Sequence, residues 1–214
     1  MSSKKPGSVF NKISFFYGLF YPMQRRHFLS VMKRLGELIG LVEVKTILDV
    51  GCGTGALCSA LHSLGYEVTG MDPAERMLEI GKRKPENKGI RFCVADATQT
   101  LPFPENSFDV SIASFVAHGM PQEQRQKMYA EMSRVTKRKV IIYDYNNNRA
   151  FWTNMIEWLE GGDYFHFIHH AENEMRQCYS QLEPCFSEVQ MVQVNTRAVF
   201  YVCIPMKKEN KPSR

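Results

Sequence analysis

The sequence predicts an α/β fold in which helices cover both faces of a parallel β-sheet, and three observations support this prediction. A short apolar strand at residues 46–50 runs directly into a turn with three glycines within residues 51–55. Leu57, Leu61 and Leu64 follow at helical spacing, so strand, turn and helix form the first half of a βαβ unit. Further apolar strands alternate with helical segments along the chain, as in α/β proteins.

The N-terminal segment, residues 10–42, is predicted to be helical. Residues 1–9 are polar and interrupted by proline and glycine, which indicates a loose tail. From Phe28 to Ile39 the apolar residues recur at i, i+3, i+4, i+7, i+10 and i+11, the pattern of an amphipathic helix that begins near His27. We expect the aromatic residues before it to lie in the core or across the mouth of a pocket.

The glycine turn predicts a site for a nucleotide-like ligand, because glycine adopts positive φ and lets a ligand approach the backbone. Gly51, Gly53 and Ala56 fit the G-x-G-x-x-G/A pattern of NAD(P) binding, with Asp72 about 20 residues further on. Asp49, just before the turn, favours S-adenosylmethionine (SAM) instead. Its carboxylate would repel a pyrophosphate and attract an α-amino group and a sulfonium.

Two more carboxylates follow predicted strands. The strand at 67–72 ends at Asp72, which can bind two ribose hydroxyls or, alternatively, cap the helix that Pro73 begins and Glu75 continues. The strand at 90–94 is followed by Asp96, which can accept the adenine amino group or, alternatively, form a turn. We favour ligand roles for both, because open α/β sheets bind ligands at the carboxyl ends of their strands.

The second half of the chain predicts two more parallel strands. The fourth, at 110–114, leads into a loop at 114–120 that should face the glycine turn across the pocket. The fifth, at 139–144, is a continuous apolar run, which indicates a strand buried on both faces.

The C-terminal third changes in character. Residues 146–183 are predicted to form an inserted cap, since aromatic residues such as Trp152 and Trp158 mix there with acidic ones, and no Lys or Arg occurs between residues 151 and 174. Residues 186–196 and 198–205 predict a final pair of strands.

Length and composition favour one domain spanning residues 1–214, because 44% of the residues are hydrophobic and can form a full core. The six cysteines include no C-x-x-C pair and no spacing with histidine that suits zinc. We therefore expect reduced thiols, a cytoplasmic location and no metal site. We also expect neither a signal peptide nor a transmembrane segment.

The positive charge is concentrated near the N-terminus. The chain has a net charge of +5, and residues 1–45 carry eight Lys or Arg against two Glu, which gives +6 for this segment alone. RNA, an anionic membrane face or an acidic substrate could each meet such a patch, but a solvated helix face is the interpretation we favour. No aromatic and basic RNA-binding signature accompanies it.

With these residues identified, the chain resembles the class I SAM-dependent methyltransferases, in particular the small-molecule group that includes the ubiquinone and menaquinone C-methyltransferases. The motifs that carry the resemblance are I-L-D-V-G-C-G-T-G at 47–55, G-M-D-P-A-E-R-M-L at 70–78, V-A-D-A at 94–97 and L-P-F-P-E-N-S-F-D-V at 101–110. The resemblance implies a Rossmann-like, seven-stranded mixed sheet that is parallel except for the last strand. It also implies SAM as cofactor and S-adenosylhomocysteine as product.

The resemblance further implies a set of cofactor-binding residues. The motif at 47–55 would hold the methionine portion, Asp72 the ribose, and Asp96 the adenine. The implied set is Tyr17, Asp49, Gly51, Cys52, Gly53, Gly55, Asp72, Pro73, Met77, Asp96, Ala97, Ser114 and Phe115. The family often has two adjacent histidines after strand four, whereas this chain has His118 and Gly119.

Methyl transfer requires a general base only when the acceptor must lose a proton. The candidates are His118, Tyr17 and a trio of histidines. The trio, His166, His169 and His170, has helical spacing and is expected to line an acceptor pocket, because three ligands on one short helix converge poorly on a metal.

The predicted function is methyl transfer from SAM to a small-molecule acceptor by in-line displacement. The aromatic and acidic cap suits a flat or cationic acceptor. The alternatives are an RNA methyltransferase, an NAD(P) oxidoreductase and a non-catalytic binding module with the SAM fold. No stable nucleic-acid complex is expected, and both a monomer and a homodimer stay open.

Overall fold

A computed structural model describes residues 8–146, 163–180 and 183–206, with side chains described from residue 18 onward. Within these residues seven strands form one sheet in the order β3-β2-β1-β4-β5-β9-β8. The strands are β1 (Thr46–Val50), β2 (Glu67–Asp72), β3 (Arg91–Val94), β4 (Phe108–Ser114), β5 (Thr136–Tyr145), β8 (Phe186–Gln193) and β9 (Ala198–Pro205).

The direction of each strand confirms the predicted mixed sheet. Strands β1 to β5 run parallel to one another, and β9, the last strand of the chain, pairs antiparallel with both β5 and β8. Strand β9 lies between β5 and β8, so the reversed strand is one position in from the edge of the sheet. The carboxyl ends of β1 to β5 therefore all meet at the same edge.

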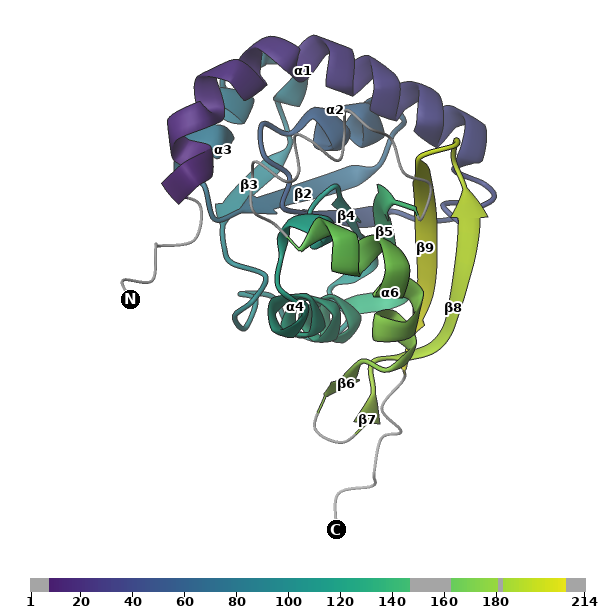
Figure 1. Cartoon of the computed structure of the whole chain (residues 1–214). Helices are drawn as coiled ribbons and strands as arrows, with labels where there is room; N and C mark the ends of the chain where they lie inside the picture. Colours follow the sequence, from purple (N-terminus) through teal and green to yellow (C-terminus); the bar gives the residue numbers. More distant parts are fainter. Residues whose placement is uncertain (1–7, 147–162, 181–182, 207–214) are drawn as a thin grey trace.

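Helices cover both faces of the sheet (Figure 1). The helices α1 (Ser8–Leu35), α2 (Ala56–Ser63) and α3 (Glu75–Lys82) contact one another on one side, and α4 (Gln122–Val135) and α6 (Tyr164–Arg176) lie on the other. Short 3-10 helices η1 (Pro85–Asn87) and η2 (Ala117–Gly119) join strands to helices. A small hairpin of β6 (Tyr179–Ser180) and β7 (Glu183–Pro184), which the sequence did not predict, follows α6.

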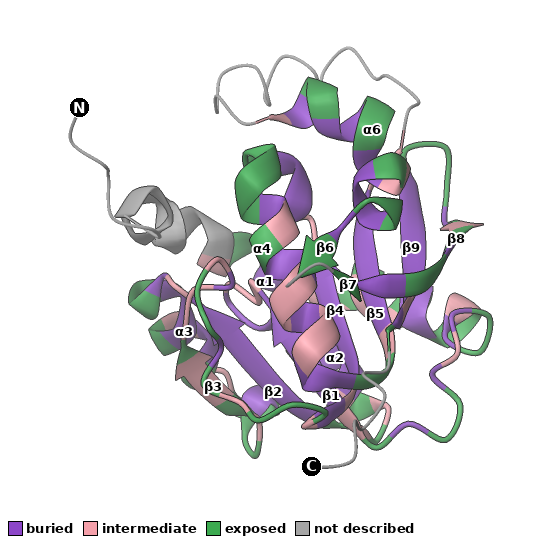
Figure 2. Ribbon diagram, turned by 90° about the horizontal axis from the view of Figure 1, so that it is seen from below, coloured by how far each residue is buried: buried purple, intermediate pink, exposed green. Residues whose placement is uncertain are grey.

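Alternate residues of the central strands enter two separate hydrophobic clusters. In β5, Val140 and Ile142 pack on the α4 and α6 side, whereas Ile141 and Tyr143 pack on the α1 and α2 side. Because both faces are covered, residues 140–143 are apolar at every position, and the central strands are largely buried (Figure 2). This confirms that the apolar run in the sequence marks a strand covered on both faces.

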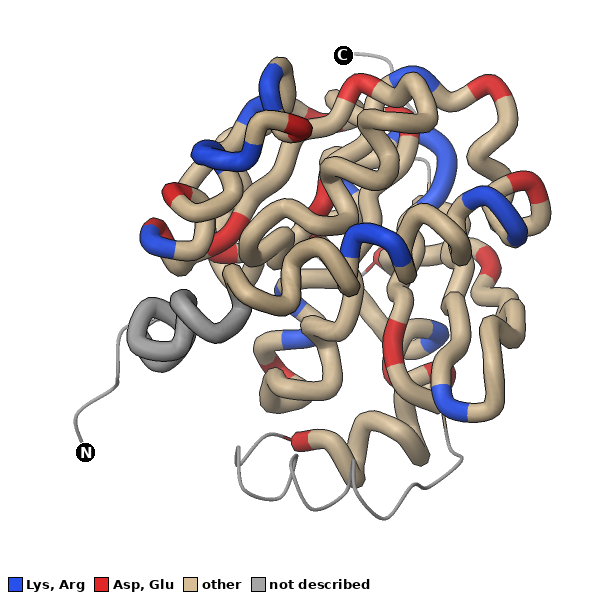
Figure 3. Tube along the Cα trace, turned by 90° about the horizontal axis from the view of Figure 1, so that it is seen from above, with Lys and Arg blue, Asp and Glu red and all other residues tan. Residues whose placement is uncertain are grey.

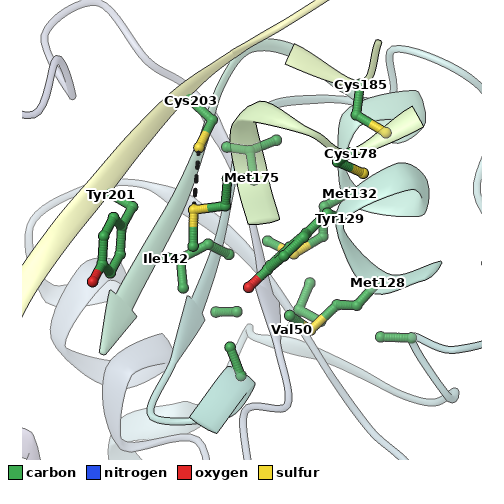
Figure 4. Close-up of a cluster of buried hydrophobic side chains, with 14 of the residues drawn as sticks. Val50, Met128, Tyr129, Met132, Ile142, Met175, Cys178, Cys185, Tyr201 and Cys203 are labelled. Carbon is green, nitrogen blue, oxygen red and sulfur yellow. Dashed lines mark hydrogen bonds between the residues drawn. The ribbon is translucent and has the colours of Figure 1, made fainter. Parts of the chain in front are cut away.

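The core beneath α4 and α6 is rich in sulfur and aromatic side chains (Figure 4). Met175 and Cys203 approach within 3.8 Å through their sulfur atoms, and Tyr129 lies fully buried beside Met128 and Met132. Flexible thioethers fill irregular space between the helices and the sheet.

Helix α1 differs from the predicted helical segment 10–42 mainly at its C-terminal end. It begins at Ser8, continues through Pro22 and ends at Leu35. Proline inside a helix removes one backbone hydrogen bond, but burial of Tyr21, Val31 and Met32 against the body of the protein holds the two halves in one helix. The apolar pattern from Phe28 to Ile39 thus covers the second half of α1 and part of the turns that follow it.

The capping pattern predicted at Pro73 is not formed. Helix α3 begins at Glu75, and its N-cap residue is Ala74, which makes no side-chain capping bond. Asp72 instead accepts a hydrogen bond from the backbone N–H of Ala74 at 2.7 Å, so its carboxylate closes the turn between strand and helix.

Part of the predicted cap at 146–183, including Trp152 and Trp158, lies outside the described residues. Its described portion, α6, packs on the main core through Tyr164, Phe167 and Met175. Among the helices of the described residues, none combines the length and apolar character that a membrane crossing requires.

Candidate functional site

A cleft of about 480 Å³ opens at the carboxyl ends of β1, β2 and β4, the edge at which ligands of open α/β sheets bind. Twelve of the predicted site residues line it: Asp49, Gly51, Cys52, Gly53, Asp72, Pro73, Met77, Asp96, Ala97, Ser114, Phe115 and His118. Residues that lie far apart in the sequence are thus brought to one place by the parallel strands.

The three glycines of the turn have different physical roles, although all have positive φ. A Cβ on Gly51 would lie 2.6 Å from Val116, and one on Gly55 would lie 2.8 Å from Phe92, so these two glycines permit close packing. A Cβ on Gly53 would meet nothing within 4 Å. Gly53 therefore keeps the cleft open where a ligand would cross the turn.

Gly55, although predicted to bind the cofactor, is not among the residues that line the cleft. It is the N-cap residue of α2, with φ +76°, and its backbone carbonyl accepts the hydrogen bond from the N–H of Ser59 that begins the helix. Its conformation sets the direction of α2, which is a structural role.

Asp72 joins the glycine turn to the end of β2. Its Oδ2 accepts a hydrogen bond from the backbone N–H of Gly53 at 2.9 Å, and its Oδ1 accepts one from the N–H of Ala74 at 2.7 Å. Burial raises the pKa of this carboxyl, while the two N–H donors lower it. Two backbone bonds thus fix the carboxylate at the cleft wall, and the second lone pair of each oxygen stays available to hydroxyl donors.

Asp49 is almost fully buried at the end of β1, with 1% of its surface exposed. Its Oδ2 accepts a hydrogen bond from the thiol of Cys58 at 3.0 Å. Its pKa is raised to about 7. Burial is the main cause, the hydrogen bond from Cys58 partly opposes the rise, and the nearby carboxylate of Asp72 adds to it. A cationic ligand group in the cleft would stabilise the ionised form.

The adenine-side residues also line the cleft. Asp96 accepts hydrogen bonds at Oδ1 from the backbone N–H and the hydroxyl of Thr98, so the turn that was the alternative interpretation is present. Ala97 is buried beside it. Across the cleft, the hydroxyl of Ser114 is buried and makes no hydrogen bond to any described residue. A polar ligand atom could satisfy it.

The opposite wall contains a strained residue. Phe115 has φ +54°, a conformation that is unfavourable for a residue with a Cβ, and its backbone N–H donates to the carbonyl of Tyr143 at 2.8 Å. Its ring lies 4.8 Å from that of Tyr143 and 5.2 Å from that of Tyr145. Strained backbone of this kind is concentrated at ligand-binding sites.

His118 is held by a buried carboxylate that the sequence did not assign. Its Nδ1 lies 2.8 Å from Oδ1 of Asp144, at the end of β5, and the backbone N–H groups of Ala117 and His118 donate to Oδ2 of the same residue. The ring also meets Tyr145 edge-on at 4.8 Å. The carboxylate thereby fixes the orientation of the imidazole at the cleft wall.

The loop at 114–120, predicted to face the glycine turn across the pocket, also contributes Val116 and Met120 to the cleft. Gln24 and Phe28 of α1 and Tyr145 at the end of β5 line the cleft as well, and these three were missed from the sequence. Tyr17 belongs to α1, but its side chain lies outside those described.

The predicted histidine trio lies on the exposed surface of α6. His166 has its Nδ1 3.1 Å from the carboxylate of Glu174. Glu174 in turn accepts two hydrogen bonds of 2.6 Å from the buried guanidinium of Arg125, which also donates to the carbonyl of Met120. This network ties α6 to the end of the cleft wall.

The charged side chains that line the cleft, among the described residues, are acidic. Among the described residues that line it are three aspartates, Asp49, Asp72 and Asp96, and no lysine or arginine. Such a cleft disfavours the pyrophosphate of a dinucleotide and favours a ligand with cationic groups. The residues present therefore fit SAM, whose sulfonium and α-amino group are both positive.

The family comparison agrees with this geometry. Residues 47–139 match the profile of a family described as a methyltransferase domain. The chain is 34% identical over 113 residues to a demethylmenaquinone methyltransferase of Renibacterium salmoninarum, a match that covers 52% of this chain and 46% of that protein. It is 37% identical over 141 residues to the enzyme of the same name from Geobacillus kaustophilus, covering 60% and 57%.

A third relative is sterol 4-C-methyltransferase strm-1 of Caenorhabditis elegans, 30% identical over 149 residues, covering 67% of this chain and 42% of that protein. The chain thus spans about half the length of the curated relatives it matches.

Solved structures share the fold. A SAM-dependent methyltransferase of Thermotoga maritima, described as a possible histamine N-methyltransferase, superposes with a TM-score of 0.64 at 18% identity, covering 92% of this chain and 99% of that one. The magnesium protoporphyrin IX methyltransferase of Synechocystis with bound S-adenosylhomocysteine gives 0.60 at 18% identity, covering 85% and 83%.

Residues 47–139 thus form a methyltransferase domain, and the chain is similar in fold, motifs and sequence to the class I SAM-dependent methyltransferases. Its relatives by sequence are enzymes named for small-molecule acceptors, which confirms the group to which the resemblance pointed.

Proposed function

We propose that this protein transfers the methyl group of SAM to a small-molecule acceptor. The observation that supports this most directly is the cleft itself, where three carboxylates and an open glycine turn meet without any basic side chain among the described lining residues. Relatives named for demethylmenaquinone and sterol acceptors support a small molecule as the acceptor. The described residues that line the cleft include no lysine or arginine, which does not favour RNA as the acceptor.

Different residues of the cleft would bind different parts of the cofactor. Asp49 and the backbone of Gly51 and Gly53 would receive the methionine portion, and Asp72 the ribose hydroxyls. Asp96 and Ala97 would receive the adenine, and the buried hydroxyl of Ser114 would accept or donate a hydrogen bond. SAM, when bound, supplies an electrophilic methyl group on a sulfonium. Positioning and exclusion of water by the cleft walls then account for most of the rate.

His118 is proposed as the general base for an acceptor that must lose a proton. With its Nδ1–H donating to Asp144, the neutral imidazole carries its basic lone pair on Nε2. Asp144 holds this tautomer and stabilises the imidazolium that forms after proton transfer. An acceptor with an acidic O–H or C–H group is the chemistry that this pair suits, and Tyr145 provides an aromatic surface beside it.

Calorimetric titration with SAM, S-adenosylhomocysteine and NAD tests the cofactor assignment. We expect the first two to bind and NAD not to bind, and Asp72→Asn to weaken binding by about tenfold or more, roughly 1.4 kcal/mol. Asp109→Asn is the matched control, because Asp109 also accepts two backbone N–H bonds, from Lys45 and Thr46, but at the opposite edge of the sheet.

The same titration separates the alternatives. Binding of NAD in place of SAM would move the protein to the oxidoreductases, and no binding by the folded protein would leave only a binding module. Tight SAM binding without turnover on any phenolic, hydroxyl or carbon-acid acceptor would contradict the role proposed for His118 but not the cofactor assignment.

A further inference from the structure

The outward face of α1 carries an unusual combination of exposed residues. Leu19, Met23, Arg26, Ser30 and Lys33 are all exposed and recur at i, i+4, i+7, i+11 and i+14, so they form one stripe along the helix. The stripe is about 21 Å long. Its first half is apolar and its second half is basic.

The apolar half is strongly exposed. Leu19 and Met23 each expose 63% of their surface, and the adjacent Phe20 exposes 54%. Five of the ten large hydrophobic side chains that are exposed in the described part of the chain belong to residues 19–42. Exposed apolar residues gathered in one place mark an interaction surface, whereas single ones do not.

The basic half has no acidic counterpart. The sequence of α1, residues 8–35, contains five Lys or Arg and no Asp or Glu. Arg25 and Arg34 contact the body of the protein, through Ser59 and the carbonyl of Val194. Arg26 and Lys33 are exposed and make no ion pair with any described residue. Helix α1 runs along the outer side of the molecule (Figures 1 and 3).

The stripe lies on the face of α1 that points away from the cleft. Gln24 and Phe28, which line the cleft, lie on the inner side of the same helix, roughly 140° and 180° around it from Leu19. The stripe and the cleft therefore use opposite faces of α1.

We propose that this face of α1 binds an anionic lipid bilayer. Leu19, Phe20 and Met23 enter the interfacial region, and Arg26 and Lys33 contact the lipid phosphates. An RNA partner would account for the exposed basic residues, but it has no apolar layer in which leucine and methionine could be buried. A helix face that contacts only solvent would not account for the exposed apolar residues.

Vesicle flotation with the full-length, ligand-free protein tests the surface. The vesicles are phosphatidylcholine alone or phosphatidylcholine with phosphatidylglycerol at roughly 2:1, at low ionic strength and at about 0.5 M salt. We expect flotation with the anionic vesicles only, reduced by salt. Leu19→Gln with Met23→Gln, and separately Arg26→Gln with Lys33→Gln, should each weaken partitioning by about tenfold or more.

The matched controls carry the same kinds of substitution at exposed residues outside α1. Met191→Gln removes an exposed methionine on β8, and Lys88→Gln with Lys127→Gln removes two exposed charges away from α1. These variants should float like the unmodified protein. Equal flotation of all variants, or no flotation with anionic vesicles, would overturn the proposal. Retention of a single-stranded RNA probe without vesicle binding would assign the face to nucleic acid instead.

SAM titration of the α1 variants keeps the two proposals separate. Unchanged cofactor affinity in a variant that no longer floats shows that the surface and the cleft are distinct. Failure of SAM to bind any form of the protein would overturn the proposed function and leave the flotation result standing.

Discussion

The backbone N–H of Gly53 donates a hydrogen bond of 2.9 Å to Oδ2 of Asp72. This bond joins the turn after β1 to the end of β2, so the two motifs of the cofactor side hold each other in place before any ligand is present. A carboxylate fixed in this way loses little conformational freedom on binding, which favours affinity.

Gly53→Ala should weaken SAM binding by tenfold or more, because its Cβ would project into the open cleft. Isothermal titration measures the effect. Gly65→Ala is the control: Gly65 also has positive φ, at +94°, and also has open space around its Cβ position, but it lies away from this cleft. Both variants should lose about 1 kcal/mol of stability. Equal effects on affinity would contradict the role of Gly53.

The affinity for SAM should depend on the ionisation of Asp49, whose pKa burial raises to about 7. A cationic ligand prefers the ionised form, so affinity should rise about tenfold between pH 6 and pH 8. Asp49→Asn should bind more weakly at pH 8 and lose this part of the pH dependence. Titrations of both proteins across this range check the prediction, and an unchanged profile in the variant would contradict it.

The same group should affect stability in the opposite direction. Its folded-state pKa lies above the unfolded value, so the folded protein holds the extra proton between about pH 4 and pH 7, and the stability from this proton is lost as the pH rises through 7. Urea unfolding at pH 5 and pH 8 should therefore show a smaller pH-dependent loss in Asp49→Asn than in the unmodified protein.

His118→Gln should lower kcat by about 10²-fold or more for an acceptor that loses a proton, with little change in SAM affinity. Asp144→Asn should lower kcat less and shift the acidic limb of the pH–rate profile, since the carboxylate acts through the imidazole. Single-turnover rates against pH measure both. A loss of rate with an unshifted profile would mean that Asp144 only supports the loop through its backbone bonds.

Arg125 and Glu174 form a fully buried ion pair. Arg125→Met alone should destabilise the protein by about 3–5 kcal/mol, because it leaves a buried carboxylate without its partner. The double variant Arg125→Met with Glu174→Met should lose less than the single one. Denaturant unfolding compares them, and a double variant as unstable as the sum of both single variants would contradict this interpretation.

Tyr129→Phe should leave stability unchanged or raise it by about 1 kcal/mol. The hydroxyl of Tyr129 is fully buried and has no hydrogen-bond partner among the described residues, so its removal relieves a desolvation penalty. Val135→Ala, in the same helix, is the contrasting variant, since deleting buried methyl groups should destabilise the protein. Thermal unfolding of both variants provides the measurement.

The cofactor side of the cleft could be predicted from the sequence because it is built from local motifs. Asp49 and Asp72 lie at the carboxyl ends of β1 and β2, and Gly53 follows β1. The apolar runs of both strands are visible in the chain, and parallel strands bring such ends together. The resemblance implied seven strands with only the last one antiparallel, whereas the position of β9 between β5 and β8 was not predicted.

The rest of the cleft depends on tertiary packing, which local sequence patterns do not predict. Gln24 and Phe28 line it only because the inner side of α1 packs beside it. Asp144 was read as the end of a strand. An acidic residue at the carboxyl end of a central strand, beside a loop with His118, was the signal that could have identified it.

The two walls of the cleft come from separate stretches of the chain. The cofactor side is built by residues 49–97, whereas the opposite wall is built by residues 114–120 and Tyr145 and is braced from behind by Arg125 and α6. Substitutions at residues 116–120 and at Tyr145 are therefore expected to change this wall of the cleft without touching Asp49, Asp72 or Asp96. A protein organised in this way can change its substrate during evolution through one half of its sequence while the other half stays constant.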